Sequence, residues 1–429
     1  MRASFAFLLP LACAPLLLAG LQPIDAGLPD RSVVTVEAHR GGYRLVRNGE
    51  PYFVKGAGGQ DHLEELADAG GNSIRTWSTG RSTKKLLDEA HRHGLTVTLG
   101  VWLRRTGDGI DYSDAKAMKR QADKVRSAVE RFKDHPALLM WAIGNEMEGD
   151  GNDPDVYAQL ESLAQLVHEL DPHHPAMTVI ADLGGGKKVR DLNRFAPSID
   201  IVGINSYGAV GSVPERYRSA GGKRPYVITE FGTRGHWESP RTAWGTPIEL
   251  SSTEKAELYR EGHTKAVGKE KLCVGAYAFL WGNKQETTAT WYGMLLPDGT
   301  RLGCVDAMSE IWTGEAPENR CPEINSLKLT ADRVKVGSTF TATLKAKDPD
   351  KDRLEVEWVL RSASDGNGSY GGREDQLDSF PRSILTSKPN RAKVRAPDKP
   401  GPYRLFAYVR DGEGGAAVHN LPLLVEARQ

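Results

Sequence analysis

Two segments decide the fold, ALLMWAIGNE (137–146) and PYVITEFG (225–232), because each is a short apolar run with a glutamate at or near its end. A strand buried on both faces shows such an unbroken run, whereas a strand with one wet face alternates. Six more runs of this kind occur: PYFVKGAG (51–58), NSIRTWS (72–78), TVTLGVWL (96–103), AMTVIAD (176–182), DIVGINSY (200–207) and VGAYAFLWG (274–282). The sequence therefore predicts eight buried strands.

Amphipathic stretches separate these runs. AMKRQADKVRSAVERFKDHP (117–136) and DVYAQLESLAQLVHELDP (155–172) carry apolar residues at steps of three and four, which is typical of helices. Eight strand–helix units over about 250 residues predict a (β/α)₈ barrel. A doubly wound open sheet is the alternative, but no G-x-G-x-x-G follows the first strand to favour it.

The N-terminal residues have the pattern of an export signal. Residues 1–26 combine Arg2 with an apolar run that is short and interrupted by prolines, so we predict a signal peptide and no integral membrane span. The protein is then expected to be secreted or periplasmic. Residues 29–318 are assigned to the barrel, including a short hairpin over residues 29–50 that turns at Arg47-Asn48-Gly49.

The pattern changes after about residue 320. Four segments alternate apolar and polar residues without intervening helices: TFTATLKAKD (339–348), LEVEWVLRS (354–362), RAKVRAPD (391–398) and YRLFAYVRDGEG (403–414). Residues 322–429 are therefore predicted to form a small antiparallel β-sandwich, an accessory domain that folds independently and is dispensable for small substrates. Among Cys273, Cys304 and Cys321, the pairing expected is Cys304 with Cys321.

Composition excludes several classes of function. The formal net charge is +0, which argues against a basic surface for nucleic acid. No His or Cys cluster has the spacing of a metal site, so no catalytic metal and no cofactor are predicted.

The functional groups of a (β/α)₈ barrel lie at the C-terminal ends of its strands. In chain order these ends offer Gly58 to His62, Arg75, Trp77, Trp102, Arg104, Asn145, Glu146, Asp182, Asn205, Tyr207, Glu230, Trp281 and Asn283. A buried ion pair with Arg75 would explain one glutamate, but two at the same rim favour chemistry. Paired carboxylates carry out glycoside hydrolysis, one as acid and the other as nucleophile or base.

The same motifs resemble a known family. AIGNEMEG and VITEFG resemble the acid/base and nucleophile motifs of the retaining glycoside hydrolases of clan A. NSIRTWS resembles the strand-two arginine motif of family 2 and related β-glucanase barrels, and NSY and FLWG resemble the motifs of strands six and eight. The resemblance covers roughly residues 40–315. It concerns the barrel alone, so the substrates of family 2 are not implied.

The resemblance implies a role for each motif residue. Glu146 would be the general acid/base and Glu230 the nucleophile, with Arg75 beside Glu230 to favour its carboxylate form. Asn145 would donate to the sugar 2-hydroxyl and Tyr207 would hydrogen-bond Glu230. The two carboxyl groups would then lie about 5–5.5 Å apart and the reaction would retain configuration.

Aromatic residues gather around the same strand ends. Core packing explains any single tryptophan, but Trp237 and Trp244 lie in a polar, Pro/Gly-rich loop and are predicted to stack on sugars. The loop 282–293 is expected to form the opposite wall, and Glu148 and Glu238 are expected to be solvated. The predicted substrate-binding residues are Arg75, Trp77, Trp102, Asn145, Asn205, Tyr207, Trp237 and Trp281.

The C-terminal region resembles polycystic-kidney-disease-type and cadherin-like immunoglobulin folds in DPDKDRLEVEW (348–358) and YVRDGEGG (408–415). Asp348, Asp350, Asp352 and Asp411 are candidate ligands of a structural Ca²⁺, and a solvated acidic turn is the alternative. Its expected role is spacing or contact with cell-surface glycans.

The function predicted is that of an exported retaining β-glycosidase acting on a β-linked glucan or a related saccharide. A carbohydrate is the expected partner. Two alternatives stay open: a non-catalytic polysaccharide-binding or cell-surface adhesion protein on a barrel scaffold, and a transglycosylase.

Overall fold

The computed structural model describes residues 31–149, 151–364 and 374–428, and the predicted signal peptide lies outside them. Eight parallel strands close into a barrel in chain order: β4 (Val54–Gly58), β5 (Ser73–Arg75), β6 (Thr96–Val101), β7 (Leu138–Ile143), β8 (Ala176–Ala181), β9 (Ile201–Asn205), β10 (Tyr226–Phe231) and β11 (Cys273–Ala278). These are the eight predicted runs, and the (β/α)₈ barrel is confirmed.

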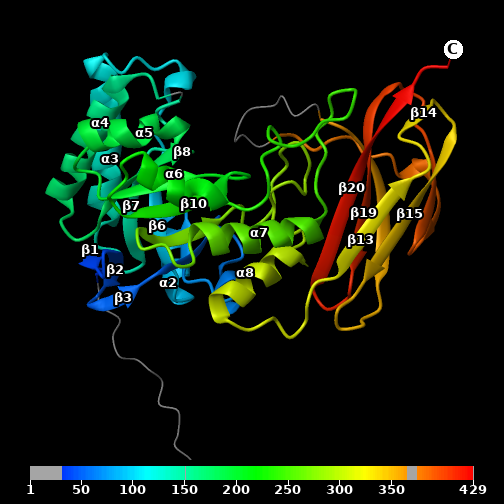
Figure 1. Cartoon of the computed structure of the whole chain (residues 1–429), viewed down its shortest axis with the longest axis horizontal. Coiled ribbons are helices and arrows are strands. Elements are labelled where there is room, and N and C mark those ends of the chain that lie inside the picture. The colour runs from blue at the N-terminus through cyan, green and yellow to red at the C-terminus, as the bar shows by residue number, and fades with distance from the viewer. Residues whose placement is uncertain (1–30, 150, 365–373, 429) are drawn as a thin grey trace, which may run out of the picture.

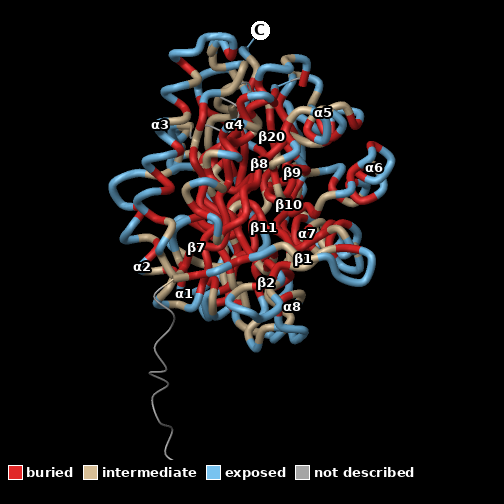
Figure 2. Tube along the Cα trace, turned by 90° about the vertical axis from the view of Figure 1, so that its left-hand side faces the viewer, coloured by how far each residue is buried: buried red, intermediate tan, exposed pale blue. Residues whose placement is uncertain are grey.

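A helix follows each barrel strand and covers the outside of the barrel (Figures 1 and 2). The helices are α1 (Leu63–Asp68), α2 (Thr83–Arg92), α3 (Ala115–Phe132), α4 (Pro154–Leu170), α5 (Lys187–Phe195), α6 (Val213–Ser219), α7 (Ser252–Ala266) and α8 (Gly303–Thr313), with 3₁₀ turns η1 (Thr106–Asp108), η2 (Gly184–Gly186), η3 (Val210–Ser212) and η4 (Pro381–Ser383). Side-chain caps fix where they begin: the Asp153 carboxylate accepts from the backbone N–H of Asp155, and Ser251 and Glu254 form a capping box.

A three-stranded antiparallel sheet precedes the barrel: β1 (Val34–His39), β2 (Gly42–Arg47) and β3 (Glu50–Tyr52). It has one strand more than the predicted hairpin. The predicted turn joins β2 to β3, and both Asn48 and Gly49 have the positive φ that a tight hairpin turn needs. Val34 and Leu45 pack with the apolar side chains at the starts of the barrel strands, so the sheet closes that end of the barrel.

The C-terminal region forms two sheets with an apolar core between them. One has the order β12-β20-β19-β16 with β14 beside β20, and the other has the order β13-β15-β18-β17. The strands are β12 (Arg301–Leu302), β13 (Glu323–Leu329), β14 (Arg333–Lys335), β15 (Thr339–Lys347), β16 (Glu355–Ser362), β17 (Ile384–Lys388), β18 (Arg391–Arg395), β19 (Gly401–Arg410) and β20 (Gly415–Glu426). The four segments predicted as strands are β15, β16, β18 and β19.

This region packs against the barrel, and its independent folding stays a prediction. Phe406, Ala416 and Val418 belong to the same buried cluster as the barrel and its helices. The short strand β12 precedes α8 yet pairs with β20, and the two sheets lie beside α7 and α8 (Figure 1). β20 does not alternate because one of its faces packs on the sandwich core and the other on the barrel.

The expected Cys304–Cys321 disulfide is wrong. The three cysteines of the described residues are buried free thiols. Cys321 Sγ lies 3.4 Å from the carbonyl oxygen of Arg301, and Cys304 Sγ lies 3.9 Å from that of Met294. None of the helices over residues 31–149, 151–364 and 374–428 is long and apolar enough to cross a membrane.

Candidate active site

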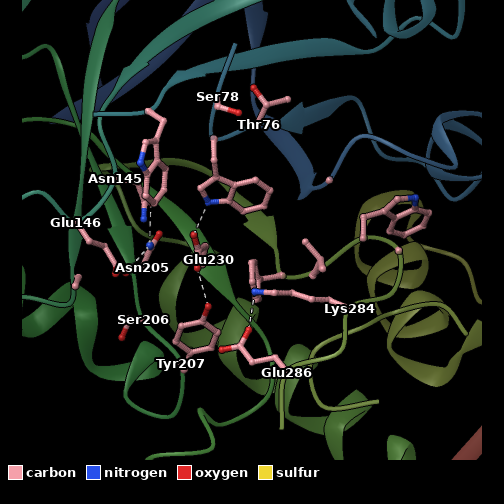
Figure 3. Close-up of a pocket in the computed structure, with 18 of the residues that line it drawn as sticks. Thr76, Ser78, Asn145, Glu146, Asn205, Ser206, Tyr207, Glu230, Lys284 and Glu286 are labelled. Carbon is pink, nitrogen blue, oxygen red and sulfur yellow. Dashed lines mark hydrogen bonds and ion pairs between the residues drawn. The ribbon is translucent and has the colours of Figure 1, made fainter. Parts of the chain in front are cut away.

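A cavity of about 1070 Å³ opens at the C-terminal ends of the barrel strands. Nine of the ten predicted site residues line it: Trp77, Trp102, Asn145, Glu146, Asn205, Tyr207, Glu230, Trp237 and Trp281. The tenth, Arg75, is buried and contacts Glu230. The strand ends therefore bring together the predicted side chains, as Figure 3 shows for those it labels.

Glu230, at the end of β10, is held by three side-chain donors. Its Oε1 accepts from Arg75 Nη1 at 2.8 Å and from Trp77 Nε1 at 2.9 Å, and its Oε2 accepts from the Tyr207 hydroxyl at 2.6 Å. Glu230 is 6% exposed and Arg75 is 1% exposed. A buried ion pair with this many donors stabilises the carboxylate and fixes its orientation. The contacts expected of Arg75 and Tyr207 are confirmed.

A row of amide side chains connects Arg75 to Glu146. Asn145 Oδ1 accepts from Arg75 Nη2 at 2.5 Å and from Asn205 Nδ2 at 3.3 Å. Asn205 Nδ2 also donates to Glu146 Oε1 at 2.8 Å, and its Oδ1 accepts from the Thr229 hydroxyl at 2.8 Å. Each amide therefore has a set orientation. Glu146 is connected to Glu230 through Asn205, Asn145 and Arg75. Figure 3 shows Asn145, Asn205 and Glu146 of this row.

Glu146 has a different environment from Glu230. Burial, and next the charge of Glu230, raise the pKa of Glu146 to about 7, while the hydrogen bond from Asn205 acts in the opposite direction. Its backbone has a φ of +53°, which is uncommon for a residue other than glycine. Gly144, two residues before it, has a φ of +71°, and a Cβ there would lie 1.9 Å from Met147 Sδ. The loop after β7 is thus tightly constrained around Glu146.

The predicted aromatic platforms divide into two groups. Trp237 is 45% exposed in the cavity and meets the edge of Tyr207 at 5.5 Å between ring centroids. Trp77 and Trp281 line the cavity but donate their indole N–H groups to Glu230 and to the carbonyl oxygen of His62. They are fixed walls of the site.

The prediction for Trp244 is wrong. Trp244 is absent from the cavity lining and lies under the guanidinium of Arg333 in β14, at 5.4 Å from the ring centroid. Its partner comes from the C-terminal region, which the local sequence could not indicate.

The expectation that Glu148 is solvated is also wrong. Glu148 is 2% exposed, forms an ion pair with Lys188 at 2.8 Å and accepts the backbone N–H of Ala181 at 3.0 Å. It joins the loop after β7 to α5. Glu238 is exposed as expected, and it accepts backbone N–H groups from Gly208 and Gly235.

Replacing Lys188 with methionine should destabilise the fold strongly. Met preserves the apolar stem but leaves the buried Glu148 carboxylate without its counter-ion, which costs about 3–5 kcal/mol. The control is Lys119→Met, which breaks an exposed helical pair with Asp123 and should cost at most about 1 kcal/mol. Urea unfolding of both variants measures the difference, and equal midpoints would refute the structural role of the buried pair.

The sequence analysis did not predict several residues that line the cavity, and in one case it named the neighbouring residue instead. The rim uses Arg105, whose guanidinium lies over the ring of Trp102 at 5.8 Å, and not Arg104. The loop 282–293 forms a wall as expected, and it contributes a Lys284–Glu286 ion pair of 2.6 Å that was not predicted. The position of this loop directly after the last barrel strand could have indicated that its charged residues line the cavity.

Across the described ranges, no group of three or more His, Cys, Asp or Glu side chains is arranged to hold a metal ion. In the C-terminal region the Asp350 carboxylate is paired with Arg320 at 2.7 Å, and Asp348 accepts the backbone N–H of Asp350 at 2.8 Å. Calcium binding there stays a prediction.

Part of the barrel matches a family model, and several curated proteins are similar to this chain. Residues 85–236, which contain Glu146 and Glu230, match the model "Glycosyl hydrolases family 2, TIM barrel domain". A β-glucuronidase of Paenibacillus borealis is 24% identical over 263 residues, covering 52% of this chain and 41% of that protein. Mannan endo-1,4-β-mannosidase F of Aspergillus fumigatus is 25% identical over 187 residues, covering 37% of this chain and 42% of that protein.

Solved structures share the fold. A Bacteroides uniformis β-glucuronidase superposes with a TM-score of 0.51 at 13% identity and covers 92% of this chain and 48% of that one. A Faecalibacterium prausnitzii β-glucuronidase gives a TM-score of 0.52 at 19% identity over 66% and 52%. The chain spans about two fifths of the length of the curated relatives it matches first. Residues 85–236 therefore resemble the TIM barrel domain of the family 2 glycosyl hydrolases.

Proposed function

We propose that the protein is a retaining β-glycosidase that hydrolyses O-glycosidic bonds by double displacement, with Glu230 as nucleophile and Glu146 as general acid/base. The observation that carries this proposal is the contrast between two carboxyl groups that line one cavity. Glu230 forms an ion pair with Arg75 at 2.8 Å, whereas the pKa of Glu146 is raised to about 7. This is the division of roles that the reaction requires.

In the first step Glu230 attacks the anomeric carbon, and the bond from that carbon to the leaving oxygen breaks. Glu146 transfers its proton to that oxygen as it departs. In the second step Glu146, now a base, takes a proton from water, and the water oxygen displaces the Glu230 carboxylate from the anomeric carbon. The amide N–H₂ of Asn145 is suited to the sugar 2-hydroxyl, because its Oδ1 already accepts from Arg75 and Asn205.

The cavity and the relatives support a β-linked saccharide as the substrate class. Trp77, Trp102, Trp237 and Trp281 surround the two carboxylates, and aromatic walls suit the flat faces of sugars. The similar proteins are named for β-glucuronides, β-mannans and β-galactosides, all with β-linkages. We expect a β-linked glucan or a related saccharide.

The test is a panel of p-nitrophenyl β-glycosides and β-linked polysaccharides. Hydrolysis of at least one member by the wild type, and none by Glu230→Gln, supports the proposal. The non-catalytic alternative, a polysaccharide-binding or adhesion protein, predicts that both proteins bind saccharides and hydrolyse none. Transglycosylation predicts longer products when sugar acceptors are added.

The rate should fall as the pH rises through about 7. Glu146 must carry a proton in the free enzyme, and its pKa is raised to about 7, so kcat/KM should decline tenfold per pH unit above that value. A dinitrophenyl leaving group needs little protonation and should flatten this limb. An identical limb for both leaving groups would contradict the assignment of Glu146.

Other expectations belong to the proposal as well. We expect export by residues 1–26, no cofactor, and an immunoglobulin-like C-terminal sandwich that contacts cell-surface glycans. The paired sheets β12-β20-β19-β16 and β13-β15-β18-β17 are compatible with the sandwich. Mass spectrometry of the exported protein would locate its first residue.

A further inference from the structure

A buried polar junction joins the C-terminal sheets to two loops of the barrel. At its centre, Glu249 accepts from Lys255 Nζ and Asn420 Nδ2 at 2.6 Å each. It also accepts from the hydroxyls of Thr288 at 2.6 Å and Thr290 at 2.9 Å. These donors come from α7, from β20 and from the loop 282–293. One carboxylate therefore fixes three segments that are far apart in the sequence.

Arg404 of β19 extends the junction. It is 0% exposed, donates from Nη1 to Asn420 Oδ1 at 2.7 Å and donates from Nη2 to the carbonyl oxygen of Pro247. Its guanidinium lies over the ring of Trp291 at 6.0 Å. The C-terminal sheet thus contacts both the loop that carries Trp237 and the loop that carries Lys284.

The contacts continue from this junction to the proposed nucleophile. Tyr292, next to Trp291, accepts the backbone N–H of His236 at 3.2 Å. Its ring meets the edge of Tyr207 at 5.8 Å between centroids, and the Tyr207 hydroxyl donates to Glu230. Tyr207 is therefore connected to Arg404 of β19 through the packed rings of Tyr292 and Trp291.

Glu374 of the C-terminal region clamps the cavity wall directly. Its backbone N–H donates to the carbonyl oxygen of Gln285, and its Oε2 accepts the backbone N–H of Thr287, both at 2.9 Å. Between these two residues lies Glu286, which lines the cavity and pairs with Lys284. In Figure 3 this pair lies on the other side of Glu230 from Glu146.

We infer that Arg404, Asn420 and Glu374 are positioning residues for the substrate wall formed by Trp237, Lys284 and Glu286. The C-terminal region is then part of the binding site and is not dispensable, even for a small substrate. The inference rests on the proposed function: since Glu146 serves the leaving group, the opposite wall contacts the sugar that is transferred to Glu230.

The first test is Glu374→Ala, assayed with the p-nitrophenyl β-glycoside that the wild type hydrolyses fastest. Loss of the clamp should raise KM about tenfold with little change in kcat, because the wall binds ground state and transition state alike. The decline of kcat/KM above about pH 7 should not move, because the substitution at Glu374 does not alter the contacts given for Glu146. Asp375→Ala removes the neighbouring exposed carboxylate and should leave KM unchanged. Equal KM values for the two variants would overturn the inference.

The second test separates positioning from stability. Asn420→Ala removes a junction contact, whereas Val394→Ala truncates a fully buried side chain in the other sheet, away from the junction. Both should lower Tm, but only Asn420→Ala should raise KM. Equal effects on KM would show a merely structural role and refute the inference.

Hydrogen exchange gives a readout that does not depend on catalysis. Amides of residues 282–293 should exchange faster in Glu374→Ala than in Asp375→Ala. If exchange is faster in Glu374→Ala but the wild type hydrolyses no substrate, the contact of Glu374 with the loop is supported and the proposed function is refuted. If the wild type is active but Glu374→Ala changes neither exchange nor KM, the positioning role of Glu374 is refuted and the proposed function is not.

Discussion

Glu230→Gln is expected to lower kcat by roughly four orders of magnitude or more on every substrate that the wild type hydrolyses. Glutamine preserves the volume but is too weak a nucleophile to form the glycosyl intermediate, so both steps of the reaction are lost. The buried Arg75 loses its counter-ion at the same time. We therefore also expect a lower Tm, with the far-ultraviolet circular dichroism of a folded barrel.

A second carboxylate of the same cavity provides the matched comparison. Glu238 lines the cavity, is exposed and contacts only backbone N–H groups among the bonds described. Glu238→Gln preserves an acceptor and should cost at most about tenfold in kcat/KM. If it costs as much as Glu230→Gln, the loss reflects the total charge of the cavity, and Glu230 is not the nucleophile.

Glu146→Ala is expected to affect substrates according to their leaving group. An unactivated sugar or alkyl leaving group needs the proton, so its cleavage should slow by about 10²–10⁴-fold. A dinitrophenyl leaving group departs without that proton, so the glycosyl intermediate should form at a near-normal rate and then accumulate. A burst of dinitrophenol followed by slow turnover measures this. Uniform loss on all substrates would contradict the role of Glu146.

The sequence was sufficient to predict the barrel, and most of the predicted side chains line its cavity. Buried parallel strands have continuous apolar runs, so β7 and β10 were recognisable, and Glu146 and Glu230 follow from their positions at or near the strand ends. Arg75 was predictable as the partner of Glu230 because strand ends converge at one rim.

Other features depend on partners that are distant in the sequence. Glu148 is buried because Lys188 lies beside it in the fold, and Trp244 contacts Arg333 of a different region. The alternation of the β-strands after residue 320 indicates a sandwich but not the surface that it buries. Val418 and Phe406 therefore gave no sign that the barrel covers them.

The central claim is that Glu230 forms the covalent intermediate while Glu146 serves as acid and base. Adding azide to Glu146→Ala tests it most directly, because azide needs no base and replaces water in the second step. The account predicts restored turnover and a β-glycosyl azide, identified by its anomeric proton coupling in NMR. The α-glycosyl azide from this variant, with the β-anomer from Glu230→Ala, would contradict the assignment.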